Sequence, residues 1–318
     1  MNVVVLAGGV GGSRFLLGMR SHLASMPDAT LQAVVNTGDD MWLAGLRITP
    51  DLDSIMYALA GVNDTERGWG RQGETERVSA ELQAWGVGWP WFTLGDLDLG
   101  AHISRTSWLR EGVPLTEVVR RLTARWPLGA ELIPATDDEV ETHVVVADGR
   151  ELHFQEWWTR HRAALPAERF VSHGIESAHA SARALEAVAA ADVIVLAPSN
   201  PVVSIGTIVA LPGMREALLS ASAPIVGVSP IIGGAVVRGM ADACLTGIGV
   251  ETSAEAVGRL YGARSEGGLL DGWLVDAVDA GASVPGVEVR AVPLWMRDES
   301  LSAEIARQAL DLAGSAQR

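Results

Sequence analysis

The sequence predicts an α/β protein: a Rossmann-like, three-layer α/β/α fold with a mostly parallel sheet and an inserted, mainly helical subdomain. Short runs rich in valine, isoleucine and leucine alternate with stretches of helical periodicity, as in a doubly wound parallel sheet. Between residues 61 and 165 this alternation stops, and eight of the eleven tryptophans lie there. We therefore expect residues 1–60 and 166–318 to form one α/β core, and residues 61–165 to form an insertion.

The expected core elements follow from the apolar runs in chain order. Residues 2–7, NVVVLA, form a β-branched run that stops at glycines, and FLLGMRSHL after it has the apolar spacing of a helix. Further buried strands are expected at residues 31–36, 192–197 and 224–228. Further helices are expected at residues 181–191, 214–220, 253–262 and 302–314.

The insertion is expected to hold polar helices and one hairpin. Residues 73–85 and 114–126 have helical spacing, and residues 143–154 are typical of a hairpin that turns at Asp148 and Gly149. Tryptophans in such a region more often fill the core of a small helical unit than bind a ligand. Some of them could still form a wall for a flat aromatic ligand.

Composition excludes several classes of function. The chain has 318 residues and a net charge of −15, and each of its 24 cationic side chains is arginine. A nucleic-acid groove is not expected, because it needs clustered positive charge. Without lysine there is no Schiff base and no P-loop lysine. Cys244 is the single cysteine, which excludes a disulfide framework and a cysteine zinc cage.

Two uncharged windows, residues 193–214 and 217–237, have the length of membrane spans. Prolines and glycines interrupt both windows, and a lipid-exposed helix would leave the freed backbone groups without partners. We therefore interpret them as buried strands with functional turns. No basic region precedes the first apolar run, so we expect no signal peptide, no membrane association and a cytoplasmic protein.

The first strand is followed by LAGGVGGSR at residues 6–14, which indicates a diphosphate site. Glycines between a strand and a helix let backbone N–H groups approach a phosphate at the helix N-terminus. The candidate residues are Gly8, Gly9, Gly11, Gly12 and Ser13. The loop is not a dinucleotide GxGxxG motif, because Arg14 stands at the place of the third glycine. The alternative is a tight turn without a ligand.

Four carboxylates follow the second strand: Asp39, Asp40, Asp51 and Asp53. In an extended segment Asp51 and Asp53 would face the same side, so we expect them to hold one Mg²⁺ ion. An equally supported alternative makes Asp53 the N-cap of a helix. Arg47 could neutralise an aspartate or a phosphate.

Two further loops follow strands. LAPSNPVVSIGTI at 196–208 offers Ser199, Asn200 and Ser204 for a base or a phosphate, unless Ser204 only caps the next helix. SPIIGGAVVRG at 229–239 offers Gly233 and Gly234 for close approach and Arg238 as an anion clamp. Three loops of this kind at strand ends are harder to explain as simple turns than one.

The insertion adds Asp96, Asp98, His102 and Arg105 within TLGDLDLGAHISRT. A lone histidine is more often structural than catalytic. The histidines show no HExxH spacing, and no GxSxG nucleophile elbow is present. The motifs thus offer positioning and charge neutralisation but no obvious nucleophile, which favours direct phosphoryl transfer.

The motifs LAGGVGGSR, NTGDD, PDLDS, GDLDLGAHI, HFQEWW, LAPSNPVVSIG, LPGMRE and SPIIGG, in this order, resemble the 2-phospho-L-lactate transferase family of coenzyme F-420 biosynthesis. The resemblance spans nearly the whole chain. It implies a CofD-like fold and a magnesium-dependent transferase. In that family the ribityl hydroxyl of the deazaflavin Fo (7,8-didemethyl-8-hydroxy-5-deazariboflavin) attacks the phosphate next to a lactyl or enolpyruvyl group carried on guanosine diphosphate, and GMP leaves.

This chain is more similar to the branch that uses the enolpyruvyl donor and makes dehydro coenzyme F-420-0. The resemblance also suggests a homodimer. It implies that residues 1–60 and 166–318 bind the nucleotide and that the insertion contributes to the deazaflavin site.

Carried over by motif, Gly8 to Ser13 would hold the diphosphate, and Ser199, Asn200 and Ser204 would seat the guanosine. Asp51 and Asp53 would bind Mg²⁺ or position the Fo hydroxyl. Asp53 is the first choice of general base and Asp51 the second. Asn36, Thr37, Asp39 and Asp40, with Asp96, His102, Gly233 and Gly234, complete the expected substrate site. The family commonly has a basic residue where this chain has Leu97, and the candidates to replace it are Arg105 and Arg110.

Two rival interpretations remain at this stage. CofD-like relatives that bind a nucleotide sugar act as regulators, but they carry APGSxxTS where this chain has APSNPVVSIG. Sugar nucleotidyltransferases also begin with LAGGxGxR, but they usually continue with a Pro-Leu-Thr stretch and a catalytic lysine, both missing here. The transferase interpretation fits more of the motifs.

Overall fold

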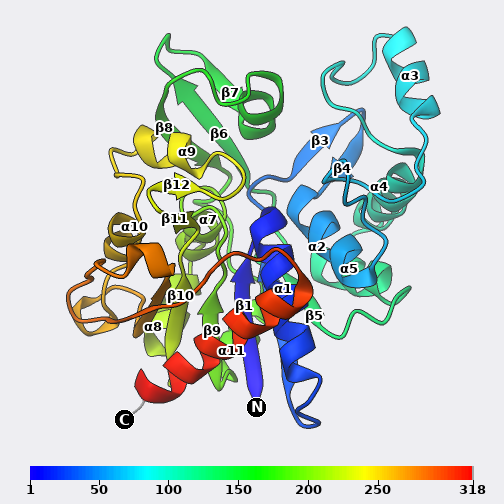
Figure 1. Cartoon of the computed structure of the whole chain (residues 1–318). Helices are drawn as coiled ribbons and strands as arrows, with labels where there is room; N and C mark the ends of the chain where they lie inside the picture. The colour runs from blue at the N-terminus through cyan, green and yellow to red at the C-terminus, as the bar shows by residue number, and fades with distance from the viewer. Residues whose placement is uncertain (317–318) are drawn as a thin grey trace.

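The computed structural model describes residues 1–316 and is built on a seven-stranded sheet (Figure 1). The strand order is β14-β13-β10-β9-β1-β2-β5, and each neighbouring pair is parallel. These strands are β1 (Asn2–Ala7), β2 (Thr30–Val35), β5 (Glu131–Pro134), β9 (Val193–Leu196), β10 (Ile225–Val228), β13 (Gly272–Val275) and β14 (Glu288–Ala291). Successive strands are added on one side of β1, as β2 and β5, and then on its other side, as β9, β10, β13 and β14, so the strand order reverses between β1 and β9. In open α/β sheets, ligands bind at the carboxyl ends of strands at such a point.

Helices cover both faces of the sheet, which confirms the predicted three-layer fold. Side chains alternate along β1: Val3 and Val5 pack on one face, and Val4 and Leu6 on the other. The first face carries α1 (Gly9–Leu23), α2 (Pro50–Ala60), α5 (Leu115–Thr123) and α11 (Glu299–Ala316). The second carries α6 (Ala182–Ala189), α7 (Ile205–Ala210), α8 (Met214–Ser220) and α10 (Ala254–Tyr261).

Two groups of smaller elements rise above the carboxyl ends of the central strands, on opposite sides in Figure 1. One is an antiparallel sheet of β6 (Glu141–Val146), β7 (Glu151–His153) and β8 (Ala167–His173) with the π-helix η1 (Glu156–Arg160). The other contains the hairpin of β3 (Met41–Leu43) and β4 (Leu46–Ile48) with α3 (Arg77–Ala84) and α4 (Asp96–Arg110). The remaining elements are β11 (Ile231–Ile232), β12 (Ala235–Val236), α9 (Ala241–Gly247), η2 (Arg264–Glu266) and η3 (Ala277–Asp279).

The segment 61–165 does not form one separate body. β5 lies inside this range but pairs with β2 in the central sheet, and α5 packs on the same core. β8 begins after residue 165 but pairs with β6. β5 was not predicted from sequence because it is short: its four residues, which end in proline, are too few to show a strand periodicity.

The hairpin expected at residues 143–154 is confirmed. β6 pairs with β7 in antiparallel register, and Gly149 takes a φ of +84° in the turn. That left-handed conformation is the reason for glycine at this place.

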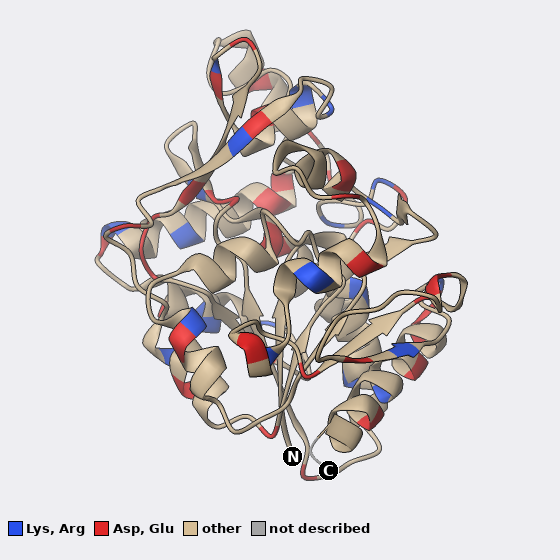
Figure 2. Ribbon diagram, turned by 90° about the vertical axis from the view of Figure 1, so that its left-hand side faces the viewer, with Lys and Arg blue, Asp and Glu red and all other residues tan. Residues whose placement is uncertain are grey.

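The outer surface carries charges of both signs. Acidic and arginine positions are interspersed along the helices in the view of Figure 2. None of the helices within residues 1–316 is long and apolar enough to span a bilayer.

Candidate active site

One cavity of about 650 Å³ lies at the carboxyl ends of β1, β9 and β10. It brings together segments that are far apart in the sequence: the glycines after β1, the start of α2, the turn after β9 and the turn after β10. Residues expected from sequence that line it are Gly8, Gly9, Gly11, Asp39, Asp51, Ser199, Asn200, Ser204 and Arg238. The glycine-rich segment, Asp51 and the Ser199–Asn200 turn therefore share one site.

The glycine segment is mostly the first turn of a helix and not a loop, because α1 begins at Gly9. The Gly8 N–H donates to Ser199 Oγ (3.0 Å), and Ser199 Oγ lies 2.8 Å from the Gly8 carbonyl oxygen, which it can donate to in turn. A Cβ at Gly11 would overlap the carbonyl oxygen of Pro198. Gly8 and Gly11 thus allow the β1–α1 and β9–α7 connections to touch, which leaves the α1 N-terminus facing the cavity, where an anion would bind.

Gly12 and Ser13 stand behind the cavity wall. A Cβ at Gly12 would come within 2.9 Å of Ser199 Oγ and of the Ala7 side chain. Ser13 Oγ donates to the Val10 carbonyl at 2.9 Å. Both residues serve the packing of α1 in this structure.

Asp51 and Asp53 point in different directions. The extended segment expected around them is wrong: both lie in the first turn of α2, where residues two apart face roughly opposite sides. Asp51 lines the cavity and accepts from Asn36 Nδ2 at 2.9 Å. Asp53 faces away from it and pairs with Arg105. The N-cap alternative for Asp53 is also wrong, since Thr49 holds that position.

Asp39 and Asp40 complete a buried group of four carboxylates with Asp51 and Asp53. Asp39 Oδ1 and both carboxylate oxygens of Asp40 have no hydrogen-bond partner. Burial raises the pKa of Asp39 and of Asp40 well above the usual range, and burial raises the pKa of Asp51 to about 6. Buried carboxylate oxygens that lack donors are the ligand set that a hard divalent cation takes, so the residues present fit Mg²⁺.

Arg105 neutralises the inner side of this group. It is 1% exposed, pairs with Asp53, and donates to the Arg47 carbonyl at 3.1 Å. Arg47 Nη2 lies 3.9 Å from Asp40 Oδ2, and Arg47 Nη1 lies 2.8 Å from Glu141 Oε1. Burial raises the pKa of Asp53, while the positive charge of Arg105 opposes that shift.

His102 belongs to the same buried network and not to the cavity wall. Its Nδ1 lies 2.9 Å from Arg105 Nη1 and must accept there, because guanidinium only donates. Its Nε2 then carries the proton, 3.5 Å from Asp98 Oδ1, which accepts from Tyr57 at 2.6 Å.

Five other expected residues lie outside the cavity. Asn36 is fully buried and orients Asp51, and Thr37 is buried beside it. Asp96 accepts from the Thr75 hydroxyl and the Val78 N–H. Gly233 and Gly234 form the turn between β11 and β12, with φ values of +59° and +76° that explain the two glycines without a ligand.

The turn after β9 is held by its own side chains. Asn200 Oδ1 accepts from the Val202 N–H at 2.9 Å, and its Nδ2 donates to Cys244 Sγ at 3.3 Å. Ser204 takes the N-cap position of α7, but its hydroxyl makes no capping bond. That hydroxyl borders the cavity and is available to a ligand.

Several lining residues were missed by sequence analysis. Aromatic side chains from the segment 61–165 form part of the wall: Trp69, Phe154 and Trp158. Of the eight tryptophans in that segment, Trp69 and Trp158 alone line the cavity. The expected aromatic wall is therefore formed by two of the eight tryptophans. Three arginines that the sequence did not single out also line the cavity, Arg14, Arg67 and Arg297, beside the expected Arg238. The HFQEWW motif was a usable signal for Phe154 and Trp158, whereas Arg67 and Trp69 lie in a segment without periodicity.

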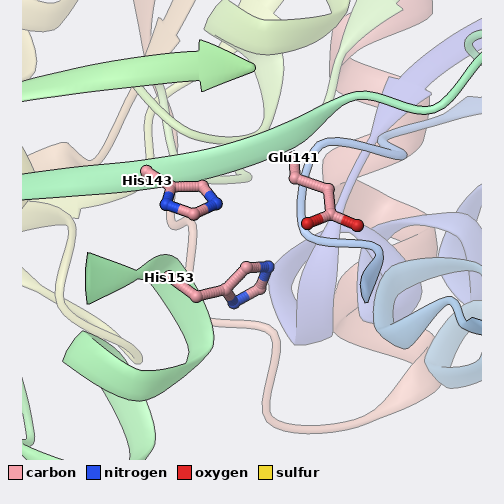
Figure 3. Close-up of side chains that lie close together, drawn as sticks. All are labelled: Glu141, His143 and His153. Carbon is pink, nitrogen blue, oxygen red and sulfur yellow. The ribbon is translucent and has the colours of Figure 1, made fainter. Parts of the chain in front are cut away.

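A second group of metal-type side chains lies on the small sheet: Glu141, His143 and His153 (Figure 3). His153 Nδ1 accepts from the Gln155 N–H at 3.1 Å, so the proton of the neutral ring sits on Nε2. Glu141 is paired with Arg47. A protonated nitrogen and a carboxylate paired with arginine make this group a poorer cation site than Asp39 and Asp51, neither of which pairs with an arginine.

Comparison with known proteins decides the family. The sequence model of the family described as "2-phospho-L-lactate transferase CofD" matches residues 3–290. The chain belongs to the CofD family. Proteins named phosphoenolpyruvate transferase are 55% identical in Nocardia farcinica, over 98% of this chain and 95% of that one, and 52% identical in Mycobacterium avium, over 99% of both. This CofD-family chain is therefore a transferase enzyme.

Solved structures confirm the fold. A Bacillus halodurans protein described as a member of the UPF0052 family aligns with a TM-score of 0.62 and 16% identity, over 97% of this chain and 98% of that chain. A second structure of a protein from the same organism aligns with the same TM-score and 17% identity. The CofD-family chain thus shares its whole architecture with them.

Proposed function

We propose that this enzyme transfers the phosphoenolpyruvyl group from enolpyruvyl-diphosphoguanosine to the ribityl hydroxyl of Fo, releasing GMP and forming dehydro coenzyme F-420-0. The names of the relatives that are 52–55% identical over nearly the whole chain support the enolpyruvyl donor over the lactyl donor. The observation that carries the proposal is the single cavity in which the α1 N-terminus, the carboxylates and the turn after β9 converge. A cytoplasmic homodimer is part of the same proposal.

The donor's diphosphate is expected at Gly8 to Gly11. The free N–H groups and positive dipole end of α1 attract anions there. Arg14 and Arg238 line the same cavity, and burial together with the charge of Arg238 lowers the pKa of Arg14. The two guanidinium groups repel each other, and an anion bound between them removes that repulsion. This local attraction opposes the repulsion that an anionic donor meets from the net charge of −15.

A magnesium ion is expected at Asp39 and Asp51, the two carboxylates that line the cavity. When bound, it would neutralise charge on the diphosphate during transfer. Asp53 was expected as a second ligand, but its pairing with Arg105 favours Asp39 in that role. Asn36 would orient Asp51 through its 2.9 Å hydrogen bond.

Transfer requires one bond exchange. The hydroxyl oxygen of Fo attacks the phosphorus that bears the enolpyruvyl group, the bond from that phosphorus to the bridging oxygen breaks, and GMP leaves with the electron pair. The loose transition state needs positioning more than a strong base. Asp51, which lines the cavity, is the proposed acceptor of the hydroxyl's proton, through the carboxylate oxygen that does not hold the ion. Trp69 and Trp158 would hold the flat deazaflavin beside it.

The direct test is an assay with purified protein, Mg²⁺, Fo and each guanylylated donor. We expect one GMP for each molecule of a more acidic, still fluorescent deazaflavin, with the enolpyruvyl donor preferred. Folded protein that releases no GMP with either donor would exclude the transfer. Faster turnover of the lactyl donor would keep the transferase but overturn the choice of donor.

A further inference from the structure

A second cavity, of about 390 Å³, lies between α2, α4 and α5. Three arginines line it, Arg71, Arg121 and Arg125, against one carboxylate, Asp96. The proposed reaction uses none of these residues. The excess of positive charge is unusual for a chain whose net charge is −15.

Two of the arginines lie against the same ring. The guanidinium carbon of Arg125 is 4.7 Å from the Trp126 ring centroid, and that of Arg71 is 5.3 Å from it. Arg121 stacks on Trp108 at 5.5 Å. The rings hold the guanidinium groups at the cavity and leave their N–H edges available, because cation–π contacts use only the faces.

Two of these three arginines, Arg71 and Arg125, lack a counter-ion within the described part of the protein, whereas Arg121 is paired with Glu117. Among residues 1–316, neither Arg71 nor Arg125 forms a salt bridge, and Arg71 Nε is buried without a hydrogen-bond partner. None of the nearby carboxylates pairs with the guanidinium group of Arg71 or Arg125: Asp96 accepts from Thr75 and Val78, Glu74 accepts from backbone N–H groups, and Glu117 accepts from Arg120 and Arg121. Two like charges on one indole, with an unused donor, are stabilised by an anion between them.

We infer that this second cavity binds the phosphate or carboxylate groups of a small metabolite, clamped by Arg71 and Arg125. Planar guanidinium groups match both oxyanions in two-pronged hydrogen bonds. The apolar side chains of Met56 and Leu122 on the same wall suit a ligand with a short carbon skeleton and not a bare ion alone.

The second cavity adjoins the active site through a short segment. Arg67, Gly68 and Trp69 line the active-site cavity, and Arg71, two residues on, lines the second one. α2 also reaches both, through Asp51 and Met56. A ligand held by Arg71 would therefore contact the segment that carries Trp69.

The test is calorimetric titration of the full-length protein at constant ionic strength, with inorganic phosphate in one arm and citrate in the other. We expect binding of at least one of them. The double variant Arg71→Met, Arg125→Met should weaken that binding by about tenfold or more. Arg238→Met, in the active-site cavity, should leave this component in place, and Arg150→Met, an exposed arginine outside both cavities, is the matched control. This binding test does not rest on the proposed function.

Three outcomes would overturn the inference: no binding of either anion to the wild type, equal binding by the double variant, or an equal loss in Arg150→Met. Because Arg125 is exposed, the single variant Arg125→Met should fold even if the double variant does not. The single variant Arg125→Met should then bind the anion more weakly than wild type does. Binding of phosphate without citrate would assign a phosphorylated ligand, and the reverse would assign a polycarboxylate.

Discussion

Asp51 carries more of the proposed chemistry than any other side chain. It lines the cavity, accepts from Asn36, and has a pKa raised to about 6 by burial. Asp53, two residues on, is held by Arg105. Sequence spacing proposed the pair but could not separate their roles, because the direction of each side chain depends on α2 beginning at Pro50.

Replacing Asp51 should abolish transfer. Asp51→Asn keeps the hydrogen-bond acceptor for Asn36 but removes the charge needed for Mg²⁺, so kcat/KM should fall by about 10²-fold or more. Steady-state GMP release measures this, and Mg²⁺ titration should show weaker binding. Asp28→Asn, on the exposed surface, is the control. A near-normal rate in Asp51→Asn would remove Asp51 from the reaction.

The raised pKa of Asp51 also predicts how stability depends on pH in metal-free protein. The folded state keeps the proton up to about pH 6, whereas the unfolded chain releases it near pH 4. Stability is therefore lost as the pH rises through this window, by up to about 3 kcal/mol above it.

Asp51→Asn should relieve this loss. In EDTA at pH 7.5, thermal unfolding of the variant should occur a few degrees above that of wild type, and the difference should shrink at pH 5. Calorimetry at the two pH values measures both. A variant that melts lower at pH 7.5 than wild type would mean that the ionised Asp51 carboxylate stabilises the fold.

The two strand–helix connections beside β1 and β9 act as one unit. A Cβ at Gly11 would collide with the Pro198 carbonyl, so these connections can approach only through glycine. The motif LAGGVGGSR pointed to this place, but the structure shows that part of its glycine content serves packing. Gly233 and Gly234 are likewise explained by backbone conformation, since both have positive φ values.

Gly11→Ala should disturb this unit. Overpacking should destabilise the protein by about 1–3 kcal/mol and raise the KM for the donor, because the α1 N-terminus moves away from the Ser199–Asn200 turn. Gly100→Ala is the control: nothing lies within 4 Å of a Cβ there, within helix α4, so the change should be neutral or stabilising. Equal donor KM in Gly11→Ala and wild type would detach this contact from binding.

The aromatic wall formed by Trp69 and Trp158 belongs to the acceptor in this proposal. Trp158→Ala should raise the KM for Fo by about 10–100-fold, the usual effect of losing one stacking partner, while donor binding stays unchanged. Trp85→Ala, which changes a side chain that is 80% exposed and outside the cavity, is the control. Unchanged KM for Fo would move the acceptor to another part of the cavity.

The architecture as a whole followed from sequence because the buried strands β1, β2, β9 and β10 are mostly apolar runs, with Gln32 the one polar residue inside β2. Short strands without periodicity, such as β5 and β14, could not be recognised, and so the edges of the sheet and the boundaries of the insertion were missed. The site was predicted where a motif follows a strand, as for Gly8 and Ser199. It was missed at Arg67 and Arg297, which reach the cavity only through tertiary folding.

The proposed function requires one cavity to bind both the metal, at its carboxylates, and the diphosphate, at the N-terminus of α1. A crystal structure with GDP and Mn²⁺ in place of Mg²⁺ would locate the metal by its anomalous signal. We expect the ion between the carboxylates of Asp39 and Asp51, with the diphosphate over the N-terminus of α1 and the guanosine at the Ser199–Asn200 turn. A metal bound at Glu141, His143 and His153, or a nucleotide outside the 650 Å³ cavity, would contradict it.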